Sequence, residues 1–404
     1  MKGICIVSSS IASAQNGAGK RAERCAEYLH ARGRLSAVIT TESSKNNVDK
    51  LNIPSDIFHT LKSEYNGKNR EEGHYLSNIP KLLASLVRMQ MSILWTVWVN
   101  RKSIDALHVF ETSGWLSLMA LSSAKVLNIN TVAEVALLGK DDPKSLVAND
   151  SFRVRGLIKM KLATTAKKYV SRSPAIRRAL LKEGVRKSEI FKSYNPINTD
   201  KYVPIGRKEK RRLKKRHNLE NRKVIIYVGK IWKRKGTALL LKTFSLVKGE
   251  HNAHLLVAGE PPQNKNGKKY MQKVKNIYHR YDLGKRVELL GYKSDVVKYL
   301  QMSDVFILPS SREGLSNAML EAMSCGLPIV AKDDDSVHGG IVVDKKHGLL
   351  VQKRTAENFS SVLVELMRNS RLRKKISDKC RKFAENNLET SLVMDEYISL
   401  YNSI

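Results

Sequence analysis

Two glutamates in the segment 304–331, Glu313 and Glu321, are the first candidates for chemistry in this chain. Glu313 precedes a helix that the residue types predict over 317–325, and Glu321 lies inside that helix. Their spacing of eight residues corresponds to roughly 12 Å of helical rise. Two carboxyl groups that act on one glycosidic bond lie about 5 to 9.5 Å apart, so these two are not expected to share one bond-breaking step.

The residues between the two glutamates can bind an anion. A predicted strand over 305–308 leads into the helix through Gly314, Leu315, Ser316 and Asn317. The first N–H groups of a helix lack backbone partners and favour phosphate. The alternative is a plain strand–helix corner with a solvated glutamate and a helix-surface glutamate, and this pattern alone does not exclude it.

A second anion-binding pattern follows a predicted strand over 224–228. Gly229 opens a turn that carries Lys230 and Lys235, five residues apart. Glycine allows the backbone to approach a ligand closely, and two cations at a strand end can straddle a diphosphate. Lysine supplies the charge but not the bidentate fork of arginine. Because the chain is so basic, ordinary surface lysines are the alternative interpretation.

A third pattern lies near the N-terminus, after a predicted strand over 3–8. We expect a loop of small residues over 9–19, which contains Gly17 and Gly19. It is not a Walker loop, because Arg21 stands where Ser or Thr is required. The loop therefore predicts either backbone contact with a phosphate or sugar, or a tight turn without a ligand.

Strands and helices alternate through most of the chain, which indicates an α/β fold with two doubly wound halves. The polar stretch 44–78 is expected to be a surface excursion, and a helix is predicted over 80–100. The segment 207–216 carries eight basic residues and one acid among ten. Such a charge run is either a solvated face or an anion-binding surface.

The composition is that of a globular protein with an anionic partner. The chain has 404 residues, enough for two domains, and 42% of them are hydrophobic. Lys and Arg number 72 against 38 Asp and Glu, which gives a formal net charge of +34. This excess points to nucleic acid, an acidic membrane surface or a phosphorylated substrate.

The sequence also bears on location. The four cysteines have no metal-binding spacing and are expected to be reduced thiols of a cytoplasmic protein. The apolar run at 4–7 is too short for a signal peptide, and no segment reaches the roughly 20 apolar residues of a membrane-spanning helix. Trp95 and Trp98 lie in a basic, apolar helix that can either lie on a membrane or pack on the core. Peripheral attachment to the cytoplasmic face of a membrane therefore stays open.

Longer stretches of sequence resemble a known family. The segment 313–331 resembles the Glu-x7-Glu signature of the retaining glycosyltransferases of family 4, the glycosyltransferase group 1 proteins. The turn 229–236 is similar to the family pattern Gly-Arg-x4-Lys-Gly, with Lys230 in place of the arginine. The segment 195–204 is similar to the linker between the two domains of these proteins. The resemblance spans most of the chain and is strongest over 223–351.

This resemblance implies the GT-B fold, in which two Rossmann-like doubly wound domains face an interdomain cleft. We expect an acceptor-binding domain over 1–195 and a nucleotide-sugar-binding domain over 196–385. The final helix, within 386–404, is expected to pack back on the first domain.

The resemblance also implies roles for single residues. Glu313 would contact the hydroxyls of the donor sugar, Glu321 the ribose, and the turn at Tyr292 the nucleobase through its backbone. The predicted donor-binding residues are Gly17, Gly19, Gly229, Lys230, Lys235, Tyr292, Glu313, Gly314, Leu315, Ser316, Asn317 and Glu321. The predicted catalytic residues are Glu313, Lys235 and Glu134.

Glu134 is included because the chain departs from the family pattern. Many members carry a histidine after the strand that we predict over 130–135, and it contacts the transferred sugar. This sequence offers Glu134 there and no histidine, so Glu134 either replaces that residue or holds a loop. His108, at the end of the preceding strand, is a further candidate.

The implied function is retaining transfer of a hexose-type sugar from a UDP- or GDP-linked donor to a glycan or lipid-linked acceptor, in the synthesis of a cell-surface polysaccharide or glycolipid. No metal and no cofactor beyond the nucleotide sugar are expected, because lysines and helix amides can neutralise phosphate. The Asp333–Asp335 triplet is not assigned to a metal, since it does not follow an early nucleotide-binding strand. The alternative is a non-catalytic protein with this fold that binds an anionic membrane or nucleic acid. With 6% aromatic residues and no recognised motif, nucleic acid is not expected as a partner.

Overall fold

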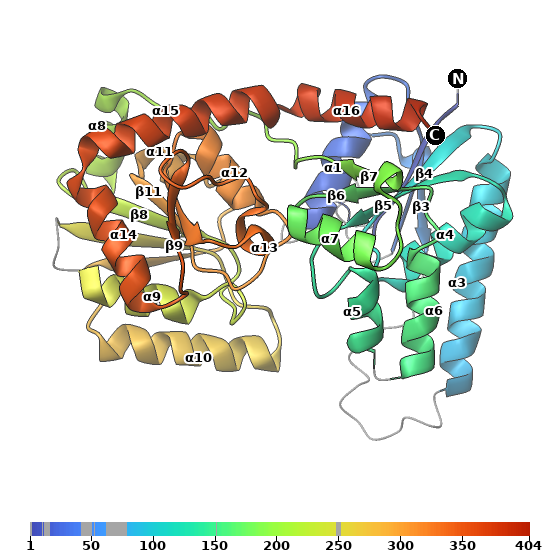
Figure 1. The fold of residues 1–404 in the computed structure, drawn as a ribbon, viewed down its shortest axis with the longest axis horizontal. Coiled ribbons are helices and arrows are strands. Elements are labelled where there is room, and N and C mark those ends of the chain that lie inside the picture. The colour runs from blue at the N-terminus through green and yellow to red at the C-terminus, as the bar shows by residue number, and fades with distance from the viewer. Residues whose placement is uncertain are drawn as a thin grey trace. The chain divides into compact units, whose positions relative to one another are not determined.

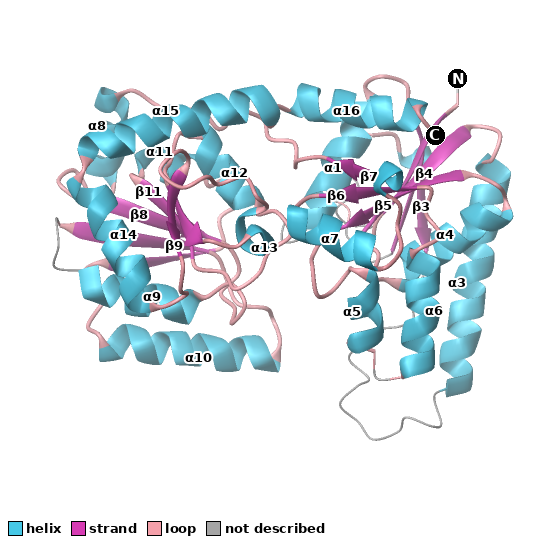
Figure 2. Ribbon diagram, viewed as in Figure 1, coloured by secondary structure: helices cyan, strands magenta, loops and turns pink. Residues whose placement is uncertain are grey.

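The chain forms two compact units, each built on a parallel β-sheet covered by helices (Figure 1, Figure 2). The computed structural model describes residues 2–9, 11, 17–41, 51, 53–61, 79–150, 152–247 and 252–404. Unit 1 comprises Met1–Ser193 and Met394–Ile404, and unit 2 comprises Tyr194–Val393. The division therefore falls inside the last helix, α16 (Thr390–Asn402), whose residues from Met394 onward belong to unit 1.

The sheet of unit 1 has the strand order β3-β2-β1-β4-β5-β6-β7, with every pairing parallel. Its strands are β1 (Gly3–Val7), β2 (Leu35–Thr41), β3 (Phe58–Leu61), β4 (Ile104–Phe110), β5 (Asn130–Val135), β6 (Lys168–Ser171) and β7 (Ile190–Lys192). Its helices are α1 (Gly17–His30), α3 (Ile79–Asn100), α4 (Trp115–Val126), α5 (Pro143–Ala148), α6 (Arg153–Ala163) and α7 (Pro174–Lys182). The chain direction along the sheet reverses between β1 and β4.

The sheet of unit 2 has the order β10-β9-β8-β11-β12-β13, again parallel throughout. Its strands are β8 (Lys223–Val228), β9 (Ala253–Ala258), β10 (Val287–Gly291), β11 (Val305–Leu308), β12 (Ile329–Lys332) and β13 (Gly348–Val351). Its helices are α8 (Arg207–Arg216), α9 (Thr237–Val247), α10 (Lys265–Arg280), α11 (Val297–Met302), α12 (Asn317–Ser324), α13 (Asp335–His338), α14 (Ala356–Arg368) and α15 (Ser370–Asn387). Here the reversal lies between β8 and β11.

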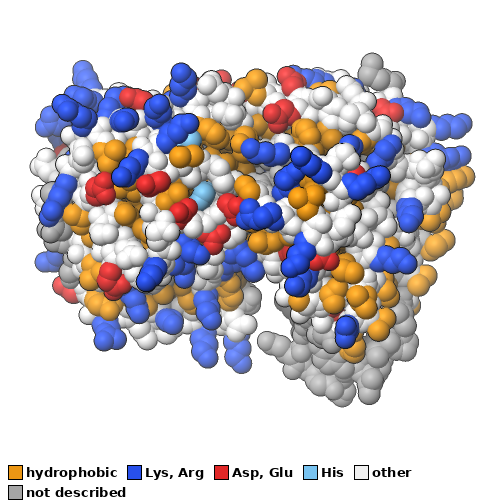
Figure 3. Space-filling view, in the orientation of Figure 1, with side chains coloured by type: hydrophobic (Ala, Val, Ile, Leu, Met, Phe, Trp, Pro, Cys, Tyr) orange, Lys and Arg blue, Asp and Glu red, His pale blue; other side chains and the backbone are white. Residues whose placement is uncertain are grey.

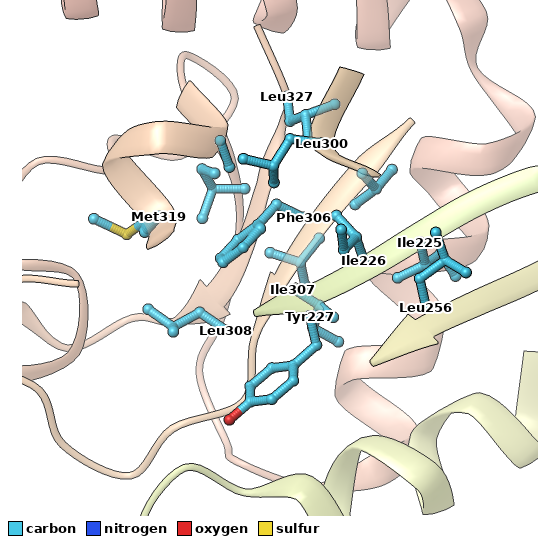
Figure 4. Packing of buried hydrophobic residues seen from close by; sticks show 14 of the residues in the cluster. Ile225, Ile226, Tyr227, Leu256, Leu300, Phe306, Ile307, Leu308, Met319 and Leu327 are labelled. Atoms are coloured by element: carbon cyan, nitrogen blue, oxygen red, sulfur yellow. The ribbon is translucent and has the colours of Figure 1, made fainter. Parts of the chain in front are cut away.

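The apolar runs of the strands form the core of unit 2. Ile226 of β8 and Phe306 of β11 are paired in the sheet and are both fully buried. Met319 of α12 packs into the same cluster, as Figure 4 shows. Strands buried on both faces read as continuous apolar runs, which is why the sequence predicted these elements. The core fixes the ends of β8 and β11, and the loops that follow them start from these fixed points.

The sequence-based expectations differ from the structure in two places. Phe58–Leu61 forms the edge strand β3 within the stretch expected to be a surface excursion. The first helix begins at Gly17 instead of Lys20, so Gly17 and Gly19 lie in its first turn and not in a loop. The preceding residues 12–16, and 62–78 of the expected excursion, lie outside the described part of the chain.

Two further predictions concern the cysteines and membrane-spanning helices. Cys5, Cys25, Cys325 and Cys380 are all buried and form no disulfide. Within the described ranges, no helix combines the length and the apolar character needed to cross a membrane.

Candidate functional site

The candidate site lies in unit 2, where the order of the strands reverses. β8 and β11 are neighbours in the sheet, yet one leads out to β9 and β10 and the other to β12 and β13. At such a point the loops after the two strands diverge and leave space for a ligand at the carboxyl ends. The loop after β8 carries Gly229–Gly236, and the loop after β11 carries Pro309–Ser316.

Glu313 is the centre of this site. Its side chain is 6% exposed, and Nζ of Lys235 lies 2.8 Å from its Oε1. A guanidinium nitrogen of Arg234 lies 3.0 Å from its Oε2. The Ser310 hydroxyl donates a hydrogen bond of 2.6 Å to Oε1. The prediction named Lys235 and Glu313 separately, and the structure brings them into contact.

The electrostatics of the site follow from these contacts. Burial on its own would raise the pKa of the Glu313 carboxyl. The neighbouring cations of Lys235 and Arg234 outweigh that effect and hold the pKa below its usual value. Glu313 is therefore ionised at neutral pH, and two cations are held within reach of it.

Arg234 is a site residue that the sequence analysis missed. The prediction named Lys230 from this loop, because Lys230 stands where the family pattern has arginine. Arg234 supplies a guanidinium from the same loop, next to Lys235, and also donates to the carbonyl oxygen of Arg312. The signal was present in the Arg234-Lys235 pair, but only the fold shows which cation turns toward Glu313.

Gly236 allows the two loops to pack this closely. Its φ angle is +78°, and a Cβ at this position would lie 2.2 Å from the carbonyl oxygen of Pro309. The same carbonyl accepts a hydrogen bond of 2.8 Å from Nε of Arg354. The amide of Ser311 donates to the carbonyl oxygen of Arg234 at 2.8 Å. The loop after β8 is thus fastened to the loop after β11 through the backbone as well as through Glu313.

Helix α12 begins beside Glu313. Ser316 caps the helix, because its hydroxyl accepts from the amide of Met319 at 3.4 Å. Nδ2 of Asn195 donates to the carbonyl oxygen of Leu315 at 3.0 Å and to Oδ1 of Asn317 at 2.6 Å. Asn317 keeps part of its surface exposed, whereas Gly314, Leu315 and Ser316 are buried. The predicted helix start is therefore ordered, and its first residue reaches the surface.

Glu321, the second glutamate, has a different environment. Its side chain belongs to the inner face of α12 and the residue is only 4% exposed. The helix that carries both Glu321 and the cap Ser316 packs on α15. Glu313 and Glu321 are thus both buried, the first within the loop after β11 and the second in the middle of α12.

The other predicted donor-binding residues of unit 2 lie at the ends of neighbouring strands. Gly229 follows β8, and Lys230 after it is exposed, with its carbonyl oxygen accepting from the Tyr227 hydroxyl at 2.8 Å. Tyr292 follows β10 and is 39% exposed. Its amide donates to Oε1 of Glu260 at 3.3 Å, so the turn expected at a nucleobase is held by a carboxylate.

Three predicted site residues, Gly17, Gly19 and Glu134, belong to unit 1 and not to the unit that contains Glu313. Gly17 is exposed and Gly19 is buried in the first turn of α1. Glu134, at the end of β5, is fully buried. Its Oε2 lies 3.1 Å from Nε of Arg21, and its Oε1 accepts from Arg172 and, at 2.7 Å, from the Tyr397 hydroxyl.

These partners make Glu134 part of a buried polar cluster. Nε2 of His108 lies 3.5 Å from the same carboxylate, and Nδ1 of His108 lies 2.6 Å from the Tyr401 hydroxyl. Burial alone would raise the pKa of Glu134, but Arg172 and Arg21 lower it well below its usual value. Burial lowers the pKa of His108, which is therefore neutral at pH 7. Since Tyr397 and Tyr401 belong to α16, the cluster fastens the last helix to the core of unit 1.

The cluster bears on the role predicted for Glu134. A contact with the transferred sugar requires an accessible carboxylate, and the Glu134 side chain has no exposed surface. The alternative interpretation of the sequence, that Glu134 holds local structure, matches the observed partners Arg21 and Arg172. A direct contact with sugar stays a prediction that would need this cluster to open.

The basic run 207–216 and the Asp333–Asp335 triplet both contain charged side chains that are paired within unit 2. Helix α8 corresponds to the basic run 207–216, and two of its lysines bind one carboxylate: Lys210 and Lys214 lie 2.9 Å and 2.7 Å from the oxygens of Asp304. In the Asp333–Asp335 triplet, Asp334 caps α13 and lies 2.8 Å from Nζ of Lys332. The basic run is thus partly a packing element and not only a solvated face.

Comparison with known proteins bears on the family and the fold of the chain. Residues 209–383 match the family model of the glycosyl transferases group 1. The chain is 28% identical to the capsular polysaccharide biosynthesis glycosyltransferase CapM of Staphylococcus aureus, over 53% of this chain and 54% of that protein. It is 26% identical to the UDP-Gal:alpha-D-GlcNAc-diphosphoundecaprenol alpha-1,3-galactosyltransferase of Escherichia coli, over 52% of each. The match thus spans about half the length of these relatives.

The fold of the whole chain is also that of a solved structure. The crystal structure of Anabaena Alr3699/HepE in complex with UDP-glucose covers 100% of both chains with a TM-score of 0.77, at 15% sequence identity. At this identity the likeness concerns the fold. Residues 209–383 are therefore similar to the glycosyl transferases group 1, and the two Rossmann-like units are those of the GT-B fold.

Proposed function

We propose that this protein is a retaining glycosyltransferase that moves a hexose-type sugar from a nucleotide-diphosphate sugar to a glycan or lipid-linked acceptor. The observation that carries the proposal is the convergence of Lys235 and Arg234 on Glu313 at the reversal point between β8 and β11. A buried carboxylate with two cations beside a helix start suits a ligand that combines a sugar with a diphosphate.

In the proposed reaction, the bond between the anomeric carbon and the diphosphate oxygen breaks while the acceptor oxygen bonds to the same face of that carbon. The acceptor proton passes to the leaving diphosphate. Negative charge grows on the diphosphate as the bond breaks, and Lys235 and Arg234 would stabilise it together with the first amides of α12. Glu313 would accept hydrogen bonds from hydroxyls of the donor sugar, and its lowered pKa keeps it an acceptor.

The remaining predicted residues complete the proposal. Glu321 would bind the ribose, and Gly229, Lys230 and Tyr292 would border the nucleotide. Gly17 and Gly19 of unit 1 would approach the donor through their backbone. Metal independence is part of the proposal, since the cations of Lys235 and Arg234 can supply the charge that the diphosphate needs.

The names of the relatives suggest a pathway class. CapM is a capsular polysaccharide glycosyltransferase, and the Escherichia coli relative acts on a diphosphoundecaprenol-linked sugar. We propose that this protein likewise acts in the assembly of a cell-surface polysaccharide or glycolipid. Among donors, UDP-linked sugars are the first to test, because HepE was crystallised with UDP-glucose, and GDP-linked sugars follow.

The decisive experiment is a donor screen that measures release of free nucleotide from UDP- and GDP-sugars, with and without candidate acceptors and with EDTA in parallel. A transferase releases nucleotide with one donor class, and the anomeric configuration of the product reports retention. Calorimetry with UDP, GDP and a single-stranded oligonucleotide separates the alternatives. Binding of the oligonucleotide alone, without nucleotide binding, would instead support a non-catalytic anion-binding protein.

A further inference from the structure

Helix α3 of unit 1 has an apolar face that points to solvent. Exposed large side chains recur at helical spacing along it: Val87, Met91, Trp95, Trp98 and Val99 are 61%, 58%, 65%, 42% and 52% exposed. The opposite face, with Ile93 and Val97, is fully buried in the core. A helix of an isolated soluble domain normally exposes polar residues on its outer face, so this second apolar stripe needs a partner.

Helix α6 repeats the pattern. Val154, Leu157 and Ile158 are 71%, 44% and 50% exposed, and Phe152, which precedes the helix, is 56% exposed. Positions 154, 157, 158 and 161 lie on one helix face. Both α3 and α6 pack on α4, so the two helices lie on the same layer of unit 1. Figure 3 shows hydrophobic side chains gathered over the helices of this unit, next to Lys and Arg.

Within helices α3 and α6 the charged residues all have one sign. Residues 79–100 and 153–163 contain no Asp or Glu. Exposed cations flank the apolar side chains: Arg88, Arg101, Lys102, Arg153 and Lys161. The nearby Asp150 is not an exception, because its carboxylate is buried between Arg155 and Lys159 at 2.7 Å and 2.8 Å. The surface is thus apolar and basic at the same time.

The two tryptophans have the geometry of interfacial anchors. Their rings stack with centroids 5.3 Å apart, and the guanidinium of Arg101 lies 4.5 Å from the centre of the Trp98 ring. An indole ring is apolar with one polar N–H, and arginine extends an apolar stem before its charge. Such groups are favoured where hydrocarbon meets charged headgroups.

We propose that the exposed faces of α3 and α6 form a docking surface for an anionic lipid bilayer, into which Trp95, Trp98 and Ile158 insert while the flanking cations contact headgroup phosphates. We call these faces the α3/α6 surface. The inference is independent of the proposed transfer reaction, since it concerns unit 1 and uses no residue of the site at Glu313.

A second copy of this chain fits the α3/α6 surface less well. A symmetric dimer interface brings the same patch of both copies together, so it would place cations opposite cations, and neither α3 nor α6 contains an acid to pair with them. An anionic bilayer provides a hydrocarbon interior for the apolar side chains and negatively charged headgroups for the cations. Each cation near such a membrane strengthens binding by roughly fivefold, and salt weakens that contribution.

The test is sedimentation of the full chain with vesicles of phosphatidylcholine containing phosphatidylglycerol, and with phosphatidylcholine alone. We expect binding to the anionic vesicles that falls at least about tenfold in the Trp95→Ala/Trp98→Ala variant. An Arg88→Gln/Arg153→Gln/Lys161→Gln variant should lose roughly 100-fold. The matched controls are Leu246→Ala, which removes an exposed apolar side chain of unit 2, and Lys268→Gln/Lys269→Gln/Lys275→Gln, which removes equal charge from α10.

Wild-type binding by the α3/α6 variants, or equal losses in the two charge variants, would overturn the proposal, because binding would then follow total charge and not this surface. Sedimentation velocity without lipid measures the oligomeric state. A wild-type dimer that becomes a monomer in the Trp95→Ala/Trp98→Ala variant would also overturn the proposal, because the surface would then bind a second copy of the chain. All the substituted side chains are exposed, so circular dichroism should show an unchanged fold in each variant.

Discussion

The ammonium group of Lys235 lies 2.8 Å from Oε1 of Glu313, although the two residues follow different strands. The contact exists because β8 and β11 are neighbours in a parallel sheet, whose loops leave at the same edge. Arg234 adds a second cation at 3.0 Å from the other carboxylate oxygen. This arrangement holds positive charge at the start of α12, and the first two predictions below depend on it.

Removing the cations should weaken nucleotide binding. We expect Lys235→Ala and Arg234→Ala each to lower the affinity for the UDP or GDP that the wild type binds by roughly 10- to 100-fold, because each variant loses a charge-assisted contact with diphosphate. Calorimetry measures this loss. Lys233→Ala, an exposed cation of the same loop, is the control and should bind as the wild type does. Equal affinity in all three variants would contradict the assignment of the diphosphate to this loop.

The two glutamates should differ in kinetics. Glu313→Gln keeps the shape of the side chain but removes its charge, and we expect it mainly to lower kcat. Glu321→Gln should mainly raise KM for the nucleotide sugar, if the residue binds ribose. Steady-state nucleotide release at varied donor concentration separates the two effects. Wild-type turnover in both variants would end the assignment of these residues.

The buried cluster at Glu134 should contribute to stability. Arg172→Met leaves the Glu134 carboxylate, whose side chain is 0% exposed, with fewer partners. Breaking a buried pair in this way costs about 3 to 5 kcal/mol, and the free energy of unfolding from denaturant titration measures it. Arg186→Met removes the exposed pair with Glu189 and should change little.

A second readout tests whether the same cluster holds the last helix. Tyr397→Phe removes the hydroxyl that binds both Arg172 and Glu134, and it should increase proteolysis near the C-terminus. Unchanged stability and protease resistance in both the Arg172 and Tyr397 variants would show that the cluster does not fasten α16.

Asp304 should make stability depend on pH. Burial alone would raise its pKa, but Lys210 and Lys214 outweigh that effect and lower the pKa from 3.8 to about 2. Because the pKa is lower in the folded state, the group stabilises the fold above the unfolded pKa of about 4 and ceases to do so as the pH falls through about 2. The contribution at neutral pH is ~2 kcal/mol.

The measurement compares wild type with Asp304→Asn by urea unfolding between pH 7 and pH 3. The wild type should be more stable at pH 7, and the difference should shrink as the pH falls below about 4. Asp378→Asn is the control, since its pair with Lys374 is exposed and should give little difference at any pH. A gap between wild type and Asp304→Asn that stays constant with pH would contradict the shifted pKa.

Local patterns in the sequence were sufficient for most elements of the site. The helix predicted over 317–325 is α12 at Asn317–Ser324, because Ser316 caps it and Gly326 follows it. The strand before it is a continuous apolar run, and the glycine turn after β8 carries the predicted lysines. Each of these features is determined by residues that are close together along the chain, so it can be predicted from the sequence.

Contacts between distant segments could not be obtained in this way. The sequence places Arg234 and Lys230 on one loop, but only the backbone path through Gly236 decides which side chains reach Glu313. It likewise left open whether Glu134 contacts the sugar or holds a loop, whereas Arg21, Arg172 and Tyr397 converge on it in the folded unit. The edge strand β3 was missed because its pairing with β2 outweighs a weak local preference.

The sequence by itself determined the alternation of strands and helices, the glycine turns, the capped helix and the excess of cations, since each is a property of residue types at short spacing. The tertiary structure decided which charges are buried together and which apolar faces stay exposed. The physical reason is that burial and charge pairing depend on strand order and helix packing, which join residues that the chain keeps far apart.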